Sequence, residues 1–279
     1  GSTSYSFKDA YIQGNVKVGD TSGSTYFQLP TTIGVSGQVL KTPSSGNTLE
    51  WTSGITAIPH KIEGTDFTGS LIIGHETTGT LSTAIKNTAV GIGALDAITQ
   101  GDNNTAIGYN AGTEITTGLH NVCVGYQAGD SITTGNYAIA IGYEALASED
   151  TSAYGGIAIG AQALTAQDGG INNVAIGNTA GLALTSASYC TFVGEQAGRG
   201  VTSGHNNTAI GKAALYTEDT GQANTAIGYH ALFTSDHSGS TSHNTAIGYT
   251  AGTAITTGTH NTLMGSDASE AITTGDKNV

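Results

Sequence analysis

The chain has 279 residues, of which 42 are glycine, 3 are proline and only 6% are aromatic, so small residues must supply most of its packing. Only 10% of the residues are charged, and the formal net charge of -13 argues against a nucleic-acid partner, which would require a basic stripe. No apolar run approaches the roughly 18 to 20 residues of a membrane helix, so we expect no membrane insertion.

The N-terminal part, residues 3–60, has the pattern of a small β module. Two runs with strand character, Val35–Lys41 and Leu49–Thr52, flank the segment PSSGN, which is rich in turn-forming residues. We expect Trp51 to close a small core in this module. Residues 61–69 are the expected junction to the rest of the chain.

Residues 70–279 form an array of repeats with a period of 17. A glycine ending an AIG-like triplet recurs along the array, and nine of its eleven intervals are 17 residues, the others being 18 and 20. A period that recovers its phase after each insertion is typical of stacked coils. Asn278 and Val279 begin a further coil, so we expect the array of about eleven full coils to continue. The anchor glycines are Gly74, Gly91, Gly108, Gly125, Gly142, Gly160, Gly177, Gly194, Gly211, Gly228, Gly248 and Gly265.

Positions in a coil are counted from the anchor glycine. Position +3 is alanine in every coil from the second onward, which predicts a site where only a methyl group fits. Position -4 is mostly asparagine, which predicts a ladder of stacked amides and tolerates a left-handed turn. The runs TAIG and ITTG predict two short strands and two turns in each coil, with parallel pairing between coils about 4.8 Å apart.

The coils are of two types that differ in the position of their large apolar residue. Coils with Ala-Gly at positions +3 and +4 carry an aliphatic residue at +7, as in Ile115 and Ile132. Four coils with Ala-Leu place the large side chain at +4 and have polar residues at +7; their leucines are Leu146, Leu164, Leu215 and Leu232. One large side chain is therefore expected to fill the same interior from either position.

Several predicted first strands are apolar on both faces, for example Val122–Val124 and Ile139–Ile141. An apolar run without alternation predicts burial on both sides. The interior of a thin coil buries only one face of the strand. We therefore expect a second copy of the chain to bury the other face. Periodicity alone leaves open whether two or three copies assemble.

The tandem NTAIGxxAG motif resembles the head repeats of trimeric autotransporter adhesins and, more closely, arrays in bacteriophage tail fibres. The N-terminal stretch FQLPTTIGVSGQVLKTPSSGNTLEW is also similar to a unit of tail-fibre shafts. The resemblance implies an all-β, left-handed parallel β-roll solenoid that assembles side by side as a homotrimer. It also implies attachment to a host surface, from a virion tail fibre or an extracellular location. The 17-residue period is longer than that of the common adhesin repeat.

The leading hypothesis is a homotrimeric fibre segment that acts as a structural spacer and attaches to a host surface. Its partner would be a cell-surface glycan or protein receptor. One alternative is a purely structural shaft whose receptor tip lies elsewhere. Another is an ice-binding solenoid, although the TT pairs that would form its threonine array are missing from the Ala-Leu coils. We expect no enzymatic activity, because the chain has no nucleophile elbow, phosphate loop or zinc-protease motif.

The best recognition candidates are tyrosines at position +1, which would form an aromatic strip along successive coils. The insertion at residues 235–243 is a second candidate because loops on a regular scaffold often carry recognition. The ligand-binding candidates are Tyr109, Tyr126, Tyr143, Tyr229, Tyr249 and His237.

No metal or other cofactor is expected, although calcium is conceivable where aspartates share position +8. Threonine fills this position in the other coils, which favours turn capping by these side chains. Histidines at position -5 (His120, His243, His260) alternate with asparagine and tyrosine, as expected for a polar turn. The calcium candidates are Asp150, Asp168, Asp219 and Asp236.

The two cysteines occupy different columns of the array. Cys123 takes an alanine position within a predicted strand and Cys190 takes an asparagine position four coils later. At about 4.8 Å per coil they are on the order of 20 Å apart, beyond disulfide reach. Cys123 is expected to be a small buried hydrophobe and Cys190 to be exposed.

Overall fold

The structure is a computed structural model that describes residues 70–73, 82–148, 155–237, 241–269 and 271–279, together with the backbone of three short strands near the N-terminus. Its internal contacts divide the chain into two units, Gly1–Ile58 and Pro59–Val279. The first unit contains an antiparallel pair, β1 (Gln38–Lys41) and β2 (Glu50–Ser53), which overlaps the two predicted runs. The side chain of Trp51, and with it the predicted small core, lies outside the described residues.

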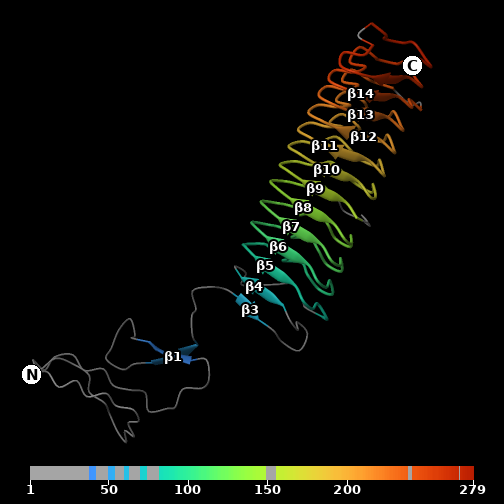
Figure 1. The fold of residues 1–279 in the computed structure, drawn as a ribbon. Coiled ribbons are helices and arrows are strands. Elements are labelled where there is room, and N and C mark those ends of the chain that lie inside the picture. Colours follow the sequence, from blue (N-terminus) through green and yellow to red (C-terminus); the bar gives the residue numbers. More distant parts are fainter. Residues whose placement is uncertain are drawn as a thin grey trace, which may run out of the picture. The chain divides into compact units, whose positions relative to one another are not determined.

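The second unit is a stack of coils joined by one sheet, in which each strand lies beside the strand of the next coil (Figure 1). Strand β3 pairs antiparallel with β4, and every later strand is parallel to the one before it. The described residues contain no helix, and so none that is long and apolar enough to span a membrane. The strands are β3 (His60–Ile62), β4 (Leu71–Ile73), β5 (Thr88–Val90), β6 (Thr105–Ile107), β7 (Val122–Val124), β8 (Ile139–Ile141), β9 (Ile157–Ile159), β10 (Val174–Ile176), β11 (Thr191–Val193), β12 (Thr208–Ile210), β13 (Thr225–Ile227), β14 (Thr245–Ile247) and β15 (Thr262–Met264).

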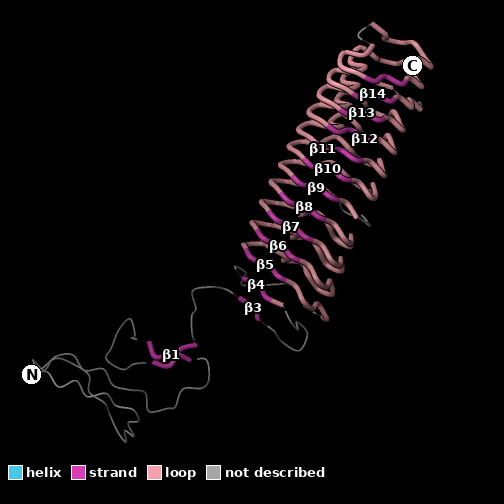
Figure 2. Tube along the Cα trace, in the orientation of Figure 1, coloured by secondary structure: helices cyan, strands magenta, loops and turns pink. Residues whose placement is uncertain are grey.

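The predicted parallel solenoid with 17-residue coils is confirmed, but each described coil contains one strand and not two. The ITTG segment is made of bends and turns, as Figure 2 shows by its loop colour. Hydrogen bonds still join it to the next coil, because Thr99 N donates to Thr116 O (3.0 Å) and Thr116 N donates to Thr133 O (2.9 Å). The chain bends at the paired threonines, so it cannot be extended there.

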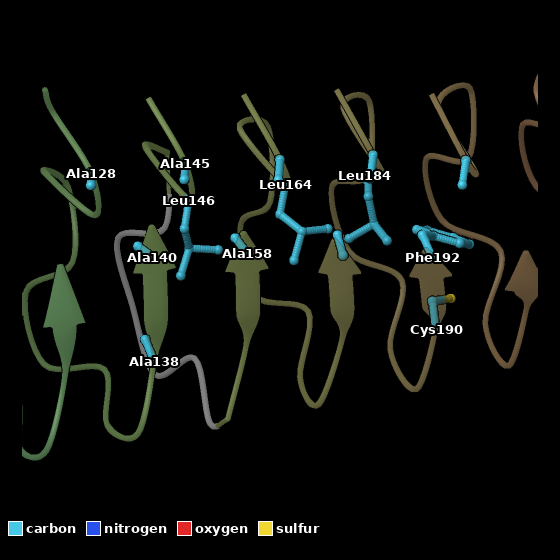
Figure 3. Close-up of a cluster of buried hydrophobic side chains, with 14 of the residues drawn as sticks. Ala128, Ala138, Ala140, Ala145, Leu146, Ala158, Leu164, Leu184, Cys190 and Phe192 are labelled. Atoms are coloured by element: carbon cyan, nitrogen blue, oxygen red, sulfur yellow. The ribbon is translucent and has the colours of Figure 1, made fainter. Parts of the chain in front are cut away.

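The core is a narrow column of small side chains inside the coils. Strand residues alternate, so the middle residue of each three-residue strand points inward and its neighbours point outward. Figure 3 shows Leu146 and Leu164 reaching from the opposite wall toward Ala140 and Ala158 on the strands. The alanines at position +3 are fully buried except Ala268 in the last coil, which is partly buried. The prediction that only a methyl group fits at +3 is therefore consistent with the packing.

The large side chain that fills the coil interior can come from position +4, from position +7 or from the strand. Position +4 has a left-handed backbone whether it is occupied by Leu146 (φ 52°) or by Gly129 (φ 59°). Phe192 replaces the usual inward alanine of β11, and the coil that contains it has glycine at +4. A Cβ atom on Gly198 would lie 2.5 Å from the Phe192 ring, so a large residue at one of these positions requires a small residue at the other.

Glycine is required at the anchor position by both backbone conformation and space. Gly125 has φ 135°, a region that side-chain-bearing residues rarely occupy. A Cβ atom there would lie 2.4 Å from the carbonyl oxygen of Gly142 in the next coil. The same contact recurs at every anchor glycine from Gly91 to Gly248, which explains why glycine is kept at this position.

The asparagine ladder forms, but its main bonds run from side chain to backbone. Asn104 N donates to the Oδ1 of Asn87 (2.8 Å), and Asn104 Nδ2 donates to Gly118 O (2.8 Å). These buried side chains thereby satisfy backbone groups of two neighbouring turns. The left-handed residue is the one before the asparagine, such as His120 at φ 59°, and this corrects the expectation for the asparagine itself.

Candidate functional site

The position +1 tyrosines form two stacked ladders. Tyr109 and Tyr126 have ring centroids 5.3 Å apart, as do Tyr126 and Tyr143, with interplanar angles of 15° and 10°. Tyr229 and Tyr249 stack in the same way at 5.2 Å. All five side chains are 39–57% exposed, so the structure places them at the surface.

Stacking determines which parts of these rings a ligand can reach. Tyr126 has a ring on each face, so only its edge and hydroxyl group meet solvent. A sugar needs a free ring face to stack on, so it cannot stack on every rung of such a ladder. Free faces are confined to the rings at the ends of the ladders.

A second group of aromatic residues extends the ladder of Tyr229 and Tyr249 across the coil. His230 stacks on Tyr229 at 3.9 Å and on Phe233 at 4.4 Å, and Phe233 stacks on Tyr216 at 4.9 Å. The guanidinium of Arg199 lies 5.5 Å from the centroid of the Tyr216 ring, within cation–π range. Sequence reasoning missed this group, although Tyr216 and Phe233 share position +5 in adjacent coils.

His237 lies inside the coil and not at the surface of the insertion. It is 2% exposed, and its Nδ1 and Nε2 lie 2.9 Å from Glu218 Oε2 and from Gly258 O, respectively. Its side chain is therefore not available for the surface ligand contact that the sequence suggested. Asp236, Thr241 and His243 are the exposed residues among those described in the insertion, and residues 238–240 lie outside the described part.

Glu218 and His237 form a buried ion pair. Both ring nitrogens of His237 face acceptors, so both donate and the ring carries a positive charge. Glu218 also accepts from Ser235 Oγ (2.8 Å), Gly221 N (2.9 Å) and His237 N (2.9 Å). The Ser235 hydroxyl donates to the Glu218 carboxylate, and the side chains of Ser235, Glu218 and His237 are all buried. The hydrogen bonds among these three residues therefore stabilise the coil interior.

Burial by itself raises the pKa of Glu218, but hydrogen bonds from His237 and Ser235 outweigh it, and the pKa is lowered. Burial likewise lowers the pKa of His237, but its bonds to Glu218 and Gly258 outweigh that, and the pKa is raised. Gln167 occupies the same position +7 without a charge, bonding to Gly170 O and Asn173. The interior thus accepts polar groups at +7 when all of their bonds are made.

The aspartates suggested for calcium lie on the surface where they are described. Asp168, Asp219 and Asp236 are exposed, and Asp150 lies outside the described residues. Thr202 Oγ1 donates to Asp219 Oδ1, a contact between side chains of adjacent coils. Within the described part of the chain, no group of three or more His, Cys, Asp or Glu residues is arranged to hold a metal ion.

The position -5 histidines occupy exposed left-handed turns. His243 Nδ1 lies 3.2 Å from His260 Nε2, and the two rings meet edge to face. His120 stacks instead on Tyr137, with centroids 5.1 Å apart. The arrangement fits the polar turn position predicted from the sequence.

Both cysteines are buried and unpaired, which corrects the expectation that Cys190 is exposed. Burial raises the pKa of Cys123 to about 12 and that of Cys190 to about 11. Cys190 replaces a ladder asparagine, and its Sγ lies 3.3 Å from Gly204 O, where the asparagine amide would donate.

We expect a thiol-reactive maleimide at neutral pH to label neither cysteine in the folded protein. Buried thiols with raised pKa values are poor nucleophiles, because the reactive species is the thiolate. Both thiols should label after unfolding in guanidinium chloride, as counted by mass spectrometry. Rapid labelling of Cys190 in the native protein would contradict its buried position.

Comparisons of the chain with protein-family models, with curated proteins and with solved structures find no match. The functional argument therefore rests on the residues and geometry described above.

Proposed function

We propose that the chain is a segment of an attachment fibre in which copies pack side by side through the outer face of the β4–β15 sheet. The observation that carries the proposal is the aliphatic face, defined as the outward third residues of these strands together with the outward first residues of β7 to β10. Val90, Ile107, Ile141, Ile176 and Ile210, all third residues, are 36–42% exposed. A row of exposed aliphatic side chains in register along a solenoid is typical of a surface that binds a partner.

The centre of the aliphatic face is its most apolar part. In β7 to β10 both outward residues of every strand are valine or isoleucine. The middle residue of each strand fills the coil interior, so these outward side chains can be covered only from outside the coil. They are Val122, Val124, Ile139, Ile141, Ile157, Ile159, Val174 and Ile176.

The size of the face suits association. Twelve strands at about 4.8 Å, each three residues of about 3.3 Å, give a face of roughly 55 by 10 Å, or about 550 Å². Three such faces turned toward a common axis bury about 1,650 Å² in total, which is within the range of specific assemblies. A second copy of the chain is the matching occupant, because it presents the same row of side chains at the same spacing.

The resemblance of the repeats to adhesin heads and tail fibres favours three copies and a left-handed coil. In this proposal the stack of coils is a spacer in a virion fibre or on an extracellular surface, and exposed aromatic groups contact a host glycan or protein. A purely structural shaft is the alternative. It shares the same assembly and lacks only the ligand contact.

Charge placed on the aliphatic face should disrupt the assembly. We expect the wild-type protein to have a mass three times 28.0 kDa by light scattering, and Ile141→Lys/Ile159→Lys to shift it to a single chain. An unpaired charge buried in an interface costs several kcal/mol. The matched control is Thr117→Lys/Thr134→Lys, which adds the same charge at exposed positions in adjacent coils away from the strands. A monomeric wild type, or an unchanged mass in the Ile variant, would contradict the proposal.

Ice binding is a second candidate because a threonine column lies on the sheet face itself. Thr208, Thr225 and Thr245 begin successive parallel strands in register. Valine or isoleucine replaces threonine at this position in β7 to β10, which interrupts the column at its centre. A thermal-hysteresis measurement tests ice binding, and a value of zero would exclude it.

A further inference from the structure

The two tyrosine ladders end in the same way. After Tyr143 the next residue in the position +1 column is Ala161, and after Tyr249 it is Ser266. Neither small residue carries a ring that could cover the last tyrosine. Tyr143 is 49% exposed and Tyr249 is 57% exposed. Each ladder therefore stops at a ring face with only a small side chain beside it in the next coil.

The faces at the other ends of the ladders are occupied differently. Tyr229 has stacked rings from both His230 and Tyr249, so both of its faces carry a ring. Tyr109 follows Ile92 in its column, a large side chain that is 67% exposed. The ring faces of Tyr143 and Tyr249 that point toward the next coil thus have a small residue beside them, whereas the other tyrosine faces in the column have a ring or a large side chain.

Polar groups stand beside each of these terminal faces. Next to Tyr143, Glu144 Oε2 accepts a hydrogen bond from Gln162 Nε2 (2.9 Å), and Gln162 directly follows Ala161. Glu144 also bonds to the Tyr143 hydroxyl and so raises the pKa of that phenol. A carboxylate and an amide are thereby held at the edge of the terminal ring.

The coil after Tyr249 has a comparable set of polar groups, and its Asp267 N donates to Tyr249 O (2.8 Å). Asp267 directly follows Ser266 and accepts from Thr250 Oγ1 and from Ser266 Oγ (2.8 Å). These hydrogen bonds lower the pKa of Asp267, which keeps the group ionised and able to accept hydrogen bonds. Each ladder end therefore has a carboxylate at position +2, which is Glu144 in the coil of Tyr143 and Asp267 in the coil after Tyr249.

We propose that the terminal faces of Tyr143 and Tyr249 each bind one pyranose ring of a carbohydrate. The apolar C–H face of the sugar stacks on the tyrosine and lies over Ala161 or Ser266, while its hydroxyl groups bond to Glu144 and Gln162 or to Asp267. An aromatic face combined with a few polar groups at its edge is the usual composition of a ligand site, and bonds to a carboxylate are the stronger kind. This site assignment deepens the proposed attachment function and rests on it for its biological meaning.

A planar heteroaromatic ligand would also stack on a free tyrosine face. It has too few hydroxyl groups to use the carboxylate and amide at the edge, so the polar groups favour the sugar. Binding is expected along the column at two isolated places and not along the inner rungs. Tyr126, covered on both faces, should therefore be dispensable for binding.

The test places an isoleucine side chain over each terminal face, as Ile92 stands in this column before Tyr109, so that the face is covered and no new ring is added. Saturation-transfer NMR on the full chain would use methyl β-D-glucopyranoside, methyl β-D-galactopyranoside and methyl N-acetyl-β-D-glucosaminide at millimolar concentrations, with sorbitol as an acyclic control. We expect transfer to at least one glycoside and none to sorbitol. Ala161→Ile/Ser266→Ile should reduce the transfer at least tenfold. Glu195→Ile, which adds the same side chain to this column three coils from Tyr143, should leave the transfer unchanged.

Three results would overturn this inference: no transfer to any glycoside, retained transfer in Ala161→Ile/Ser266→Ile, or stronger transfer to indole than to the sugars. Light scattering on the same samples keeps the two proposals apart. A trimer without glycoside binding overturns the sugar site and leaves the shaft alternative. A monomer that binds glycoside in the expected pattern overturns the assembly and leaves the site.

Discussion

Replacement of His237 by alanine is expected to lower the free energy of unfolding by about 3–5 kcal/mol near pH 6, because it leaves the buried Glu218 carboxylate without its cation. Glu218→Gln should cost much less, about 1 kcal/mol. Its Oε1 can still accept from Gly221 N and His237 N. Its amide can donate to Ser235 Oγ and to Nδ1 of a neutral His237, whose Nε2 still donates to Gly258 O.

The ion pair should also give the protein a characteristic pH dependence. The pKa of Glu218 is lowered from 4.5, so its contribution is fully present above pH 4.5 and is lost as the pH falls through the lowered pKa. The pKa of His237 is raised from 6.5, so its contribution is present below pH 6.5 and is lost as the pH rises through the raised pKa. The stabilisation by the pair is therefore greatest between these two values.

Thermal and guanidinium denaturation across this pH range, followed by circular dichroism, would measure both effects. Glu218→Gln should remove the part of the profile that is due to the pair, leaving a flatter curve. Gln167, a neutral side chain at the same position in another coil, indicates that the interior accommodates such a change. Equal destabilisation by His237→Ala and Glu218→Gln, or an unchanged pH profile in both, would show that no charged pair exists there.

Phe192→Ala is expected to destabilise the protein by about 3–5 kcal/mol through loss of buried area and formation of a cavity. Phe192 is the largest fully buried side chain of the described core and stands where most strands have alanine. For a unit of this length the change corresponds to a Tm lower by roughly 6–20 °C. Calorimetry of the purified variant would measure it.

A second substitution should recover much of this loss. Gly198→Leu in the Phe192→Ala background gives the coil alanine on the strand, leucine at +4 and Val201 at +7, close to the native set Ala89, Leu95 and Ile98. In the wild-type background the same leucine meets the Phe192 ring and should destabilise. The coupling between the two sites should be about 1–3 kcal/mol. Additive effects would contradict the exchange of interior volume between these positions.

The surface features were predictable only in part. The tyrosine column follows directly from the period, and its exposure and stacking agree with the strip predicted from the sequence. The covered faces of the inner rungs were not predictable, since they depend on ring orientation. His237 was misplaced because an insertion resembles a projecting loop, yet this segment returns a charged side chain to the core, where Glu218 from the previous coil binds it.

The sequence alone determined the coil length, the parallel stacking and the small-residue interior, because each follows from the periodic spacing of glycine and alanine. Tertiary structure decided which run becomes a strand. TAI is extended and paired, whereas ITTG bends at its threonines although both have strand-like composition. It also decided that polar residues at +7 point inward and that Cys190 is buried. For the ITTG bends, Glu218 and Cys190, hydrogen-bond partners lie about one period away in adjacent coils, where local propensity does not register them.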